Sequence, residues 1–397
     1  MESLKVEVPT GIVQGEFDER FASVVDRFVD NYHEYDEVGA SLCVSHEGET
    51  VIDVWGGAVD REMTAPWESD TISIVMSCTK GAVALCAHVL ANRGLLDVEA
   101  PVKEYWPEFA RNGKENATVR MMLDHSVGVP ALRGELPGDF MVHWDQVCDR
   151  LAAEEPFWEP GTRNGYHLIN FGWTVGELVR RVSGKSLGTF FQEEICQKLG
   201  IDFWIGLPEE HEPRVSNMIQ ATPPAAGGHV SRFMQVVMTQ PESATRHAMA
   251  NLMSQTTQGR AWHAAEIGGG GGITNARGLA GMYTPLAIGG GSLLDEATLN
   301  KARRCSVATN YDATLQIATR FGLGFMLSMD NRDKYDKDSV VMGDNAFGHV
   351  GMGGSIGFAD PSIGLAMGYS MNRMGPGILL NERGQGLVDA AYAAVNA

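Results

Sequence analysis

A serine and a lysine three positions apart, in Ser77-Cys78-Thr79-Lys80, are the side chains of this sequence best suited to chemistry. The run before them, residues 71–75, is short, apolar and rich in β-branched residues. The run after them, residues 81–92, is rich in Ala, Leu and Val, and a glycine follows where a helix would end. The spacing therefore predicts that the serine begins a helix and that the lysine lies one turn further along the same face.

A hydroxyl held beside an amine at a helix start has the parts of an activated nucleophile. A neutral lysine amine can accept the hydroxyl proton. The backbone N–H groups at the helix start carry the positive end of the helix dipole and supply half of an oxyanion hole. A four-residue pattern is too short to identify an enzyme, so other segments have to support it.

Three later segments extend the pattern: Leu123–Pro130, residues 158–167 with Gly165-Tyr166-His167 at their end, and Phe347–Gly354. Together with the first motif, their order, spacing and flanking residues resemble the serine β-lactamase and penicillin-binding-protein superfamily. Within it, residues 38–372 most resemble the class C-like family VIII carboxylesterases. The resemblance implies a serine carboxylesterase that needs no cofactor and hydrolyses small short-chain carboxylic esters through an acyl-enzyme.

The resemblance also implies a role for each matching catalytic residue. Ser77 would attack the ester carbonyl, and Lys80 would accept its proton. Tyr166 would share the role of general base and pass the proton to the leaving alcohol. The backbone N–H groups of Ser77 and Met352 would form the oxyanion hole.

His349, Gly351 and His125 are expected at the substrate site, His125 mainly as a structural hydrogen-bonding group. Two positions depart from the superfamily pattern. Leu168 stands where an asparagine is expected two residues after the motif tyrosine, which puts in doubt a hydrogen bond from that position to the lysine. His349 and Val350 replace the lysine and the hydroxyl residue that grip a substrate carboxylate, so neutral esters are favoured over β-lactams and peptides.

The sequence around these motifs predicts how the chain is organised. Apolar residues from Phe17 to Tyr32 recur at helical spacing and predict an amphipathic first helix. Runs at 40–44 and 50–55 predict a hairpin with a longer loop at 45–49. The later strands are expected at 321–329, 346–350, 355–359 and 364–371, followed by a last helix that includes 387–395.

This pattern and the resemblance both imply an α+β fold of the β-lactamase/transpeptidase type. Residues 1–76 and 306–397 would form an antiparallel sheet from both chain ends, flanked by helices. Residues 77–305 would form an inserted, mostly helical region, with the active site at the junction.

Gly353–Gly357 is a complete G-x-S-x-G match and the main competing motif. An α/β-hydrolase would need a strand, turn and helix around Ser355 and a histidine later in the chain. His349 is the last histidine, and a strand is expected after Ser355, so we interpret Ser355 as a turn serine near the site. Cys78 is interpreted as a small buried thiol and the glycine run 268–272 as a backbone-permissive loop.

The composition excludes other classes of function. A formal net charge of −19, spread along the chain, opposes binding to nucleic acid and to anionic membranes. Residues 1–19 contain no apolar stretch of signal-peptide length, and the six cysteines have no regular spacing. These features predict a cytoplasmic protein with reduced thiols. The sequence contains no metal-binding motif, and it leaves the oligomeric state open.

Two alternatives remain open. A β-lactamase, another amide hydrolase or an acyltransferase of the same fold would use the same acylation machinery. A binding protein that kept the fold and lost activity belongs to a different class. The intact Ser77, Lys80 and Tyr166 argue against the binding protein.

Overall fold

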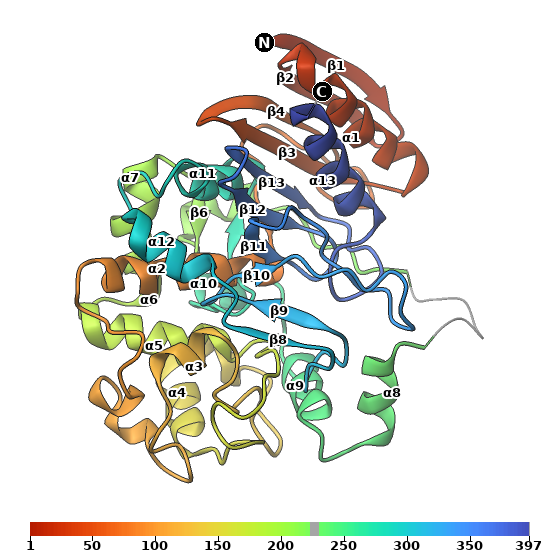
Figure 1. Ribbon diagram of the computed structural model, residues 1–397. Coiled ribbons are helices and arrows are strands. Elements are labelled where there is room, and N and C mark those ends of the chain that lie inside the picture. The colour runs from red at the N-terminus through yellow and green to blue at the C-terminus, as the bar shows by residue number, and fades with distance from the viewer. Residues whose placement is uncertain (223–229, 397) are drawn as a thin grey trace.

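A ten-stranded antiparallel sheet dominates one part of the molecule (Figure 1), within the residues that the computed structural model describes, 1–222 and 230–396. The strand order is β1-β2-β4-β3-β13-β12-β11-β10-β9-β8. The two chain ends meet in the middle of this sheet, where β3 pairs with β13 and Ser41 lies opposite Ser370. The strands of this sheet are β1 (Glu2–Val8), β2 (Gly11–Phe17), β3 (Gly39–His46), β4 (Glu49–Gly57), β8 (Val307–Thr309), β9 (Thr319–Phe321), β10 (Met326–Leu327), β11 (Phe347–Val350), β12 (Ile356–Asp360) and β13 (Leu365–Met371).

The two faces of the sheet carry side chains of different size. Met367 and Tyr369 of β13 belong to the hydrophobic core formed with α1 (Ala22–Glu34) and α13 (Glu382–Val395). Gly368 lies on the opposite face, against α11 (Ala276–Ala287). A Cβ atom at Gly368 would lie 2.3 Å from the Ala276 carbonyl oxygen, so only glycine allows the helix to approach this closely. Figure 1 shows the sheet between α1 and α13 on one side and α11 on the other.

Most of the remaining helices lie to the left of and below the sheet in Figure 1, with α2 (Thr79–Asn92) among them, whereas α8 (Arg232–Thr239) and α9 (Ala244–Met253) lie at the lower right. Residues 79–90 of α2 are all buried, because this helix is apolar or small on nearly every face. α5 packs directly against it. The other helices are α3 (Val119–Leu123), α4 (Trp144–Ala153), α5 (Phe171–Ser183), α6 (Leu187–Phe191), α7 (Gln197–Leu199), α10 (Arg260–Ala264) and α12 (Glu296–Arg303).

A small three-stranded sheet ties the start of α2 to distant segments. Its strands are β5 (Ser73–Ile74), β7 (Ile273–Thr274) and β6 (Phe203–Trp204). β7 follows the glycine run 268–272, so pairing of β5 with β7 holds that run beside the beginning of α2.

The fold class and the sheet built from both chain ends are therefore confirmed. The helix start predicted at Ser77 and the helix end before Gly94 are also confirmed, since α2 ends at Asn92. The division into 1–76 with 306–397 and an inserted 77–305 remains a prediction.

The first helix was predicted to begin too early. Phe17 ends β2, and Asp18 caps a short turn before α1 begins at Ala22. The hairpin β1–β2 was not anticipated, because its outward residues are polar and short alternating runs give a weak signal.

Two turns also differ from the prediction. The β3–β4 hairpin is tighter than expected, since Glu47 and Gly48 alone form its turn, with φ of 54° and 87°. The expected strand 321–329 is two strands, β9 and β10. Gly322 donates its N–H to Phe325 O at 2.9 Å and Gly324 has φ of 83°, so the chain reverses between them.

Candidate active site

The start of α2 brings Ser77 and Lys80 together. A 3₁₀ turn, Met76–Cys78, leads directly into the helix. Met76 has φ of 47°, in the left-handed region that residues with side chains rarely adopt. Lys80 lies one helical turn beyond Ser77, and its Nζ is 2.9 Å from Ser77 Oγ. Ser77 is half-buried and therefore partly accessible to solvent, whereas Lys80 is fully buried.

Lys80 is completely buried among neutral groups. Its Nζ donates to the carbonyl oxygens of Leu168, at 2.7 Å, and Gly269, at 2.6 Å. Burial lowers the pKa of Lys80 well below its ordinary value, because a buried ammonium loses its hydration. Position 168 therefore forms a hydrogen bond to Lys80 although it is a leucine and not an asparagine, because the backbone carbonyl makes the contact.

The glycine run 268–272 lies at this site, but not for the reason predicted from the sequence. None of these glycines has a positive φ. The need for glycine is one of space: a Cβ atom at Gly269 would lie 2.0 Å from the carbonyl oxygen of Ile169. The close approach is what allows the Gly269 carbonyl to reach Lys80.

The aromatic ring of Tyr166 packs against the amine of Lys80. Lys80 Nζ lies 4.7 Å from the centre of the Tyr166 ring, which stacks on Phe321 at 5.8 Å. The Tyr166 hydroxyl is 3.4 Å from His349 Nε2. Burial raises the pKa of Tyr166, and the neighbouring Ser77 side chain only partly offsets this. The phenol is therefore neutral over the neutral pH range.

Asp312 holds the backbone at Tyr166 and was not found from the sequence. Its carboxylate accepts hydrogen bonds from the N–H of Tyr166, at 3.0 Å and 3.1 Å, and from the N–H groups of Thr314 and Leu315. Asp312 is fully buried, and burial raises the pKa of its carboxyl. It belongs to no recognisable motif and lies 146 residues after Tyr166, so no local pattern could have linked the two.

β11 forms the sheet side of the site. Cys78 Sγ donates to the His349 carbonyl oxygen at 3.3 Å, which holds the strand against the turn that carries Ser77. A Cβ atom at Gly351 would lie 2.4 Å from the Val75 carbonyl oxygen, so glycine is required there. In the described residues, the backbone N–H of Met352, which follows, donates to no backbone carbonyl.

His349 is buried and uncharged. Its Nδ1 lies 2.8 Å from the Val350 carbonyl oxygen, so a hydrogen on Nδ1 leaves Nε2 as an acceptor facing Tyr166. Burial and then the charge of Lys80 lower the pKa of His349 to about 3. A neutral imidazole in this position has no charge to offer to a substrate carboxylate.

His125 lies behind Tyr166. Its ring is fully buried, with centroids 4.9 Å from Tyr166 and 4.7 Å from Phe321. Its Nδ1 accepts the backbone N–H of His167 at 3.2 Å. These are contacts within the protein, and the role of His125 at the substrate site stays a prediction.

Two competing nucleophiles have structural roles. Ser355 is buried just before β12, and its Oγ donates to the Val75 carbonyl oxygen at 3.1 Å. A strand and not a helix follows it, so the α/β-hydrolase interpretation is excluded. Cys78 is buried, and burial raises its pKa to about 12, so its thiol is inert near neutral pH.

Comparison with known proteins places the chain in a family. A family model described as "Beta-lactamase" matches residues 21–390. The chain belongs to the β-lactamase family. The esterase/beta-lactamase LipL of Mycobacterium tuberculosis is 35% identical over 370 residues, which cover 91% of this chain and 83% of LipL.

Solved structures agree with this assignment. A family VIII carboxylesterase is 37% identical, with a TM-score of 0.85 over 96% of this chain and 99% of the other. A penicillin-binding protein homolog from Caulobacter crescentus is 33% identical, with a TM-score of 0.85 and the same coverage. The resemblance inferred from the motifs is confirmed, and this member of the β-lactamase family is an enzyme of the serine hydrolase class, similar to named esterases.

Two features are absent from the described residues: a membrane-spanning helix and a cluster of metal ligands. Among them, no helix is both long and apolar enough to cross a bilayer. No group of three or more histidine, cysteine or acidic side chains in the same residues is arranged to hold a metal ion.

Proposed function

We propose that this enzyme is a serine carboxylesterase that hydrolyses small, uncharged, short-chain esters through an acyl-enzyme on Ser77. One observation carries the proposal: a deeply buried lysine amine lies 2.9 Å from the oxygen of a half-buried serine at a helix start. The short acyl chain follows from the resemblance to family VIII carboxylesterases.

The surroundings of Lys80 favour it as the base that takes the Ser77 proton. A neutral amine has two N–H groups and one lone pair. The carbonyl oxygens of Leu168 and Gly269 accept both N–H groups, so the lone pair is left facing Ser77 Oγ. The lowered pKa of Lys80 keeps the amine neutral at the pH where it has to accept a proton.

Tyr166 is suited to relay that proton. Its raised pKa keeps the hydroxyl protonated, so it can donate its proton to the departing alcohol oxygen while the Tyr166 oxygen receives the proton that Lys80 took from Ser77. The Ser77–carbonyl bond then remains and the ester C–O bond is broken. In deacylation, water attacks the acyl carbonyl carbon, and its proton passes through Tyr166 and Lys80 to Ser77 Oγ. The Ser77–acyl bond breaks and the carboxylic acid is released.

The developing oxyanion requires two hydrogen-bond donors. The backbone N–H groups of Ser77 and Met352 lie on the two segments that Cys78 and Ser355 hold together. Within the described residues neither N–H is used by a backbone carbonyl, which leaves both free for a substrate oxygen.

The sheet side of the site supports neutral substrates. His349 carries no charge, Val350 has no hydroxyl, and the nearest amine, on Lys80, is buried behind Tyr166. A substrate carboxylate would therefore lose its hydration at this wall without gaining an ion pair. β-Lactam hydrolysis is the second candidate function, because LipL is named both an esterase and a β-lactamase.

A substrate panel on one purified sample tests the proposal. p-Nitrophenyl acetate, butyrate and octanoate would be compared with nitrocefin by kcat/KM. We expect butyrate to exceed nitrocefin by about tenfold to a hundredfold, since a charged hydrogen bond that nitrocefin cannot form here contributes about 1.5–3 kcal/mol. Equal kcat/KM for both would favour the β-lactamase, and no turnover of any substrate would favour an inactive binding protein. The cytoplasmic location remains a prediction beside this function.

A further inference from the structure

A cleft of about 810 Å³ lies at the C-terminal end of α12, between that helix, the β8–β9 hairpin and the segment before β11. Figure 1 shows where these elements lie in the fold. It is separate from the Ser77 site and shares no lining residue with it. Its lining includes one carboxylate, from Asp344, and five cationic side chains: Arg120, Lys301, Arg303, Arg304 and Arg320.

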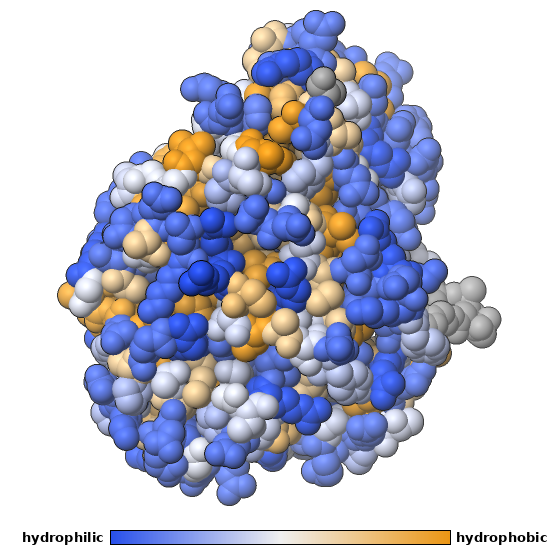
Figure 2. Space-filling model, in the orientation of Figure 1, coloured by the Kyte–Doolittle hydropathy of each residue, from blue (hydrophilic) through white to orange (hydrophobic). Residues whose placement is uncertain are grey.

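This concentration of positive charge is unusual for the chain. The sequence has 50 acidic and 31 basic residues and a formal net charge of −19. Basic side chains in such a protein have many carboxylates with which to pair. Figure 2 shows strongly hydrophilic patches on this face, over the region of α12 and β9, on either side of a paler and more apolar strip.

Three of the five cations have no carboxylate partner among the described residues. Arg120 and Lys301 both pair with Glu99. By contrast, Arg303 Nε donates only to Asn300 Oδ1, at 2.9 Å, and Arg320 Nη1 only to the Ser328 carbonyl oxygen, at 3.2 Å.

Arg304 has no partner of any kind in the same part of the chain. The guanidinium groups of Arg303, Arg304 and Arg320 therefore keep most of their donor capacity.

Neutral polar side chains complete the lining. The amides of Asn300 and Asn345 lie in the cleft beside the arginines, and the Ser306 hydroxyl there donates to Asp124 Oδ2 at 2.7 Å. Its volume falls in the range of small-molecule sites, but its walls are far more polar than those of a typical site for an apolar ligand. An elongated nucleic acid is disfavoured, because the rest of the acidic surface would repel it.

We infer that this cleft binds a small compound with several negative charges on phosphate groups, such as a polyphosphate or an organic diphosphate. A planar guanidinium donates two parallel hydrogen bonds to phosphate oxygens, and three unpaired arginines can share a multiply charged group. This inference goes beyond the proposed esterase activity and does not depend on it.

Isothermal titration of the full chain with inorganic pyrophosphate tests the inference. We expect saturable binding of one pyrophosphate per chain in 50 mM KCl. The variant Arg303→Gln/Arg304→Gln should bind at least about a hundredfold more weakly, because each arginine that binds phosphate contributes about tenfold in affinity. Arg304→Gln alone should weaken binding about tenfold. Because the exposed Arg304 side chain forms no hydrogen bond or ion pair among the described residues, this single variant should keep the wild-type melting temperature.

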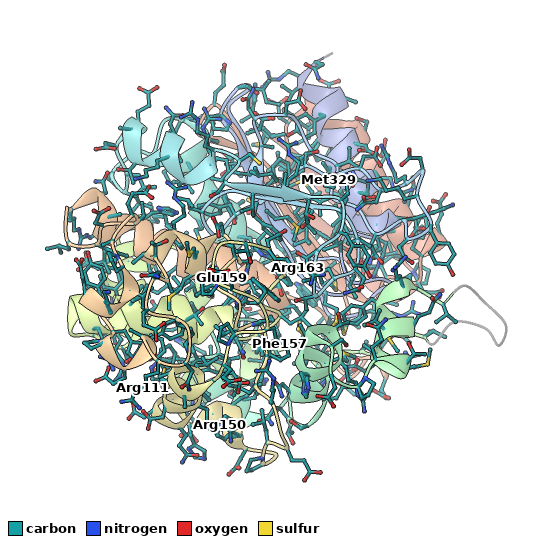
Figure 3. The ribbon with its side chains drawn as sticks, turned by 60° about the horizontal axis from the view of Figure 1, so that its bottom comes forward. Arg111, Arg150, Phe157, Glu159, Arg163 and Met329 are labelled. Carbon is teal, nitrogen blue, oxygen red and sulfur yellow. The ribbon has the colours of Figure 1, made fainter. Side chains whose placement is uncertain are left out.

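A matched control variant removes two positive charges from arginines outside the cleft. Arg111 and Arg150 are exposed, have no carboxylate partner in the described residues, and lie in the helical part of the molecule, well away from α12 in Figure 3. Arg111→Gln/Arg150→Gln should bind pyrophosphate within about twofold of the wild type.

Equal weakening in both double variants would show a general charge effect and overturn the inference. The inference would also be overturned if Arg304→Gln and Arg303→Gln/Arg304→Gln both bound pyrophosphate with wild-type affinity. A parallel titration with phosphatidylglycerol vesicles separates a free phosphate ligand from a lipid headgroup. Binding to vesicles without binding to pyrophosphate would also contradict a small-molecule site.

Discussion

Lys80 and Arg304 are two cations of one chain in opposite surroundings. Lys80 is completely buried, both N–H groups of its neutral amine can be accepted by carbonyl oxygens, and its pKa is well below the ordinary value. Arg304 is exposed in the lining of a cleft, and among the described residues its side chain forms no hydrogen bond or ion pair. An arginine at the surface keeps its charge and its hydrogen-bond donors.

The comparison shows that burial decides what a basic side chain can do. Removing water from the lysine disfavours the ammonium and makes the amine a proton acceptor. Leaving water around the arginines keeps them charged, so they suit an anionic ligand that can replace that water. The Lys80 site and the arginine cleft should therefore respond differently to substitution. Four measurements test the roles assigned to their residues.

The largest effect is expected at the proposed nucleophile, Ser77. Ser77→Ala should lower kcat for p-nitrophenyl butyrate by at least about 10⁴-fold, because no acyl-enzyme can form. Ser355→Ala is the matched control and should keep a substantial part of the activity. A phosphonate inhibitor followed by peptide mass mapping should place its adduct on the peptide that contains Ser77. An adduct on Ser355 would refute the assignment.

Replacing the proposed base, the buried Lys80, is expected to have the next largest effect. Lys80→Met removes the amine but keeps an apolar side chain of similar length, so kcat should fall by at least about a hundredfold. Arg304→Gln removes a cation from the cleft and should leave kcat within about twofold. Steady-state kinetics on both variants sharpen the comparison, and near-wild-type turnover in Lys80→Met would mean that another group is the base.

Asp312→Ala should reduce stability by about 2–4 kcal/mol, because it leaves the N–H groups of Tyr166, Thr314 and Leu315 buried without acceptors. Asp344→Ala, an exposed carboxylate in the cleft, should change stability by less than about 0.5 kcal/mol. Urea unfolding of both variants measures the difference. Similar midpoints for the two variants would show that the Asp312 network contributes little.

The pH profile should follow the buried lysine. Catalysis needs the neutral amine, which is present above the pKa of Lys80 and is lost as the pH falls through it, so log kcat/KM should decline by about one per pH unit on the acid side. The pKa of His349 is lowered to about 3, so this histidine does not titrate near neutrality. His349→Asn should therefore leave the acid limb in place. Loss of that limb in the variant would identify the histidine as the base.

The sequence predicted one side of the active site better than the other. Ser77 and Lys80 are three residues apart on one helix, so helical geometry alone puts them together. Tyr166 and His349 were linked to them only by the resemblance to a family. The hydrogen bond between Leu168 and Lys80 was put in doubt, because the sequence pattern concerns side chains and the contact is made by a backbone carbonyl.

The errors in the fold have local causes. The strand expected at 321–329 bends because Gly324 takes a positive φ, which apolar composition does not reveal. The β3–β4 turn is shorter than predicted because Glu47 adopts a left-handed conformation that residues other than glycine rarely take. The sheet itself was predicted correctly, since apolar runs near both chain ends had to find partners.

The amino-acid sequence by itself determined the helix that carries Ser77 and Lys80, the neutral pair His349–Val350 and the acidic balance of the chain. Those features depend on residue type and on spacing within a turn or a strand. The tertiary structure alone decided that Asp312 holds the backbone of Tyr166 and that unpaired arginines from α12 and β9 line one cleft. Such contacts join segments far apart in the chain, and the protonation of Lys80 depends on how completely they exclude water, which no local pattern encodes.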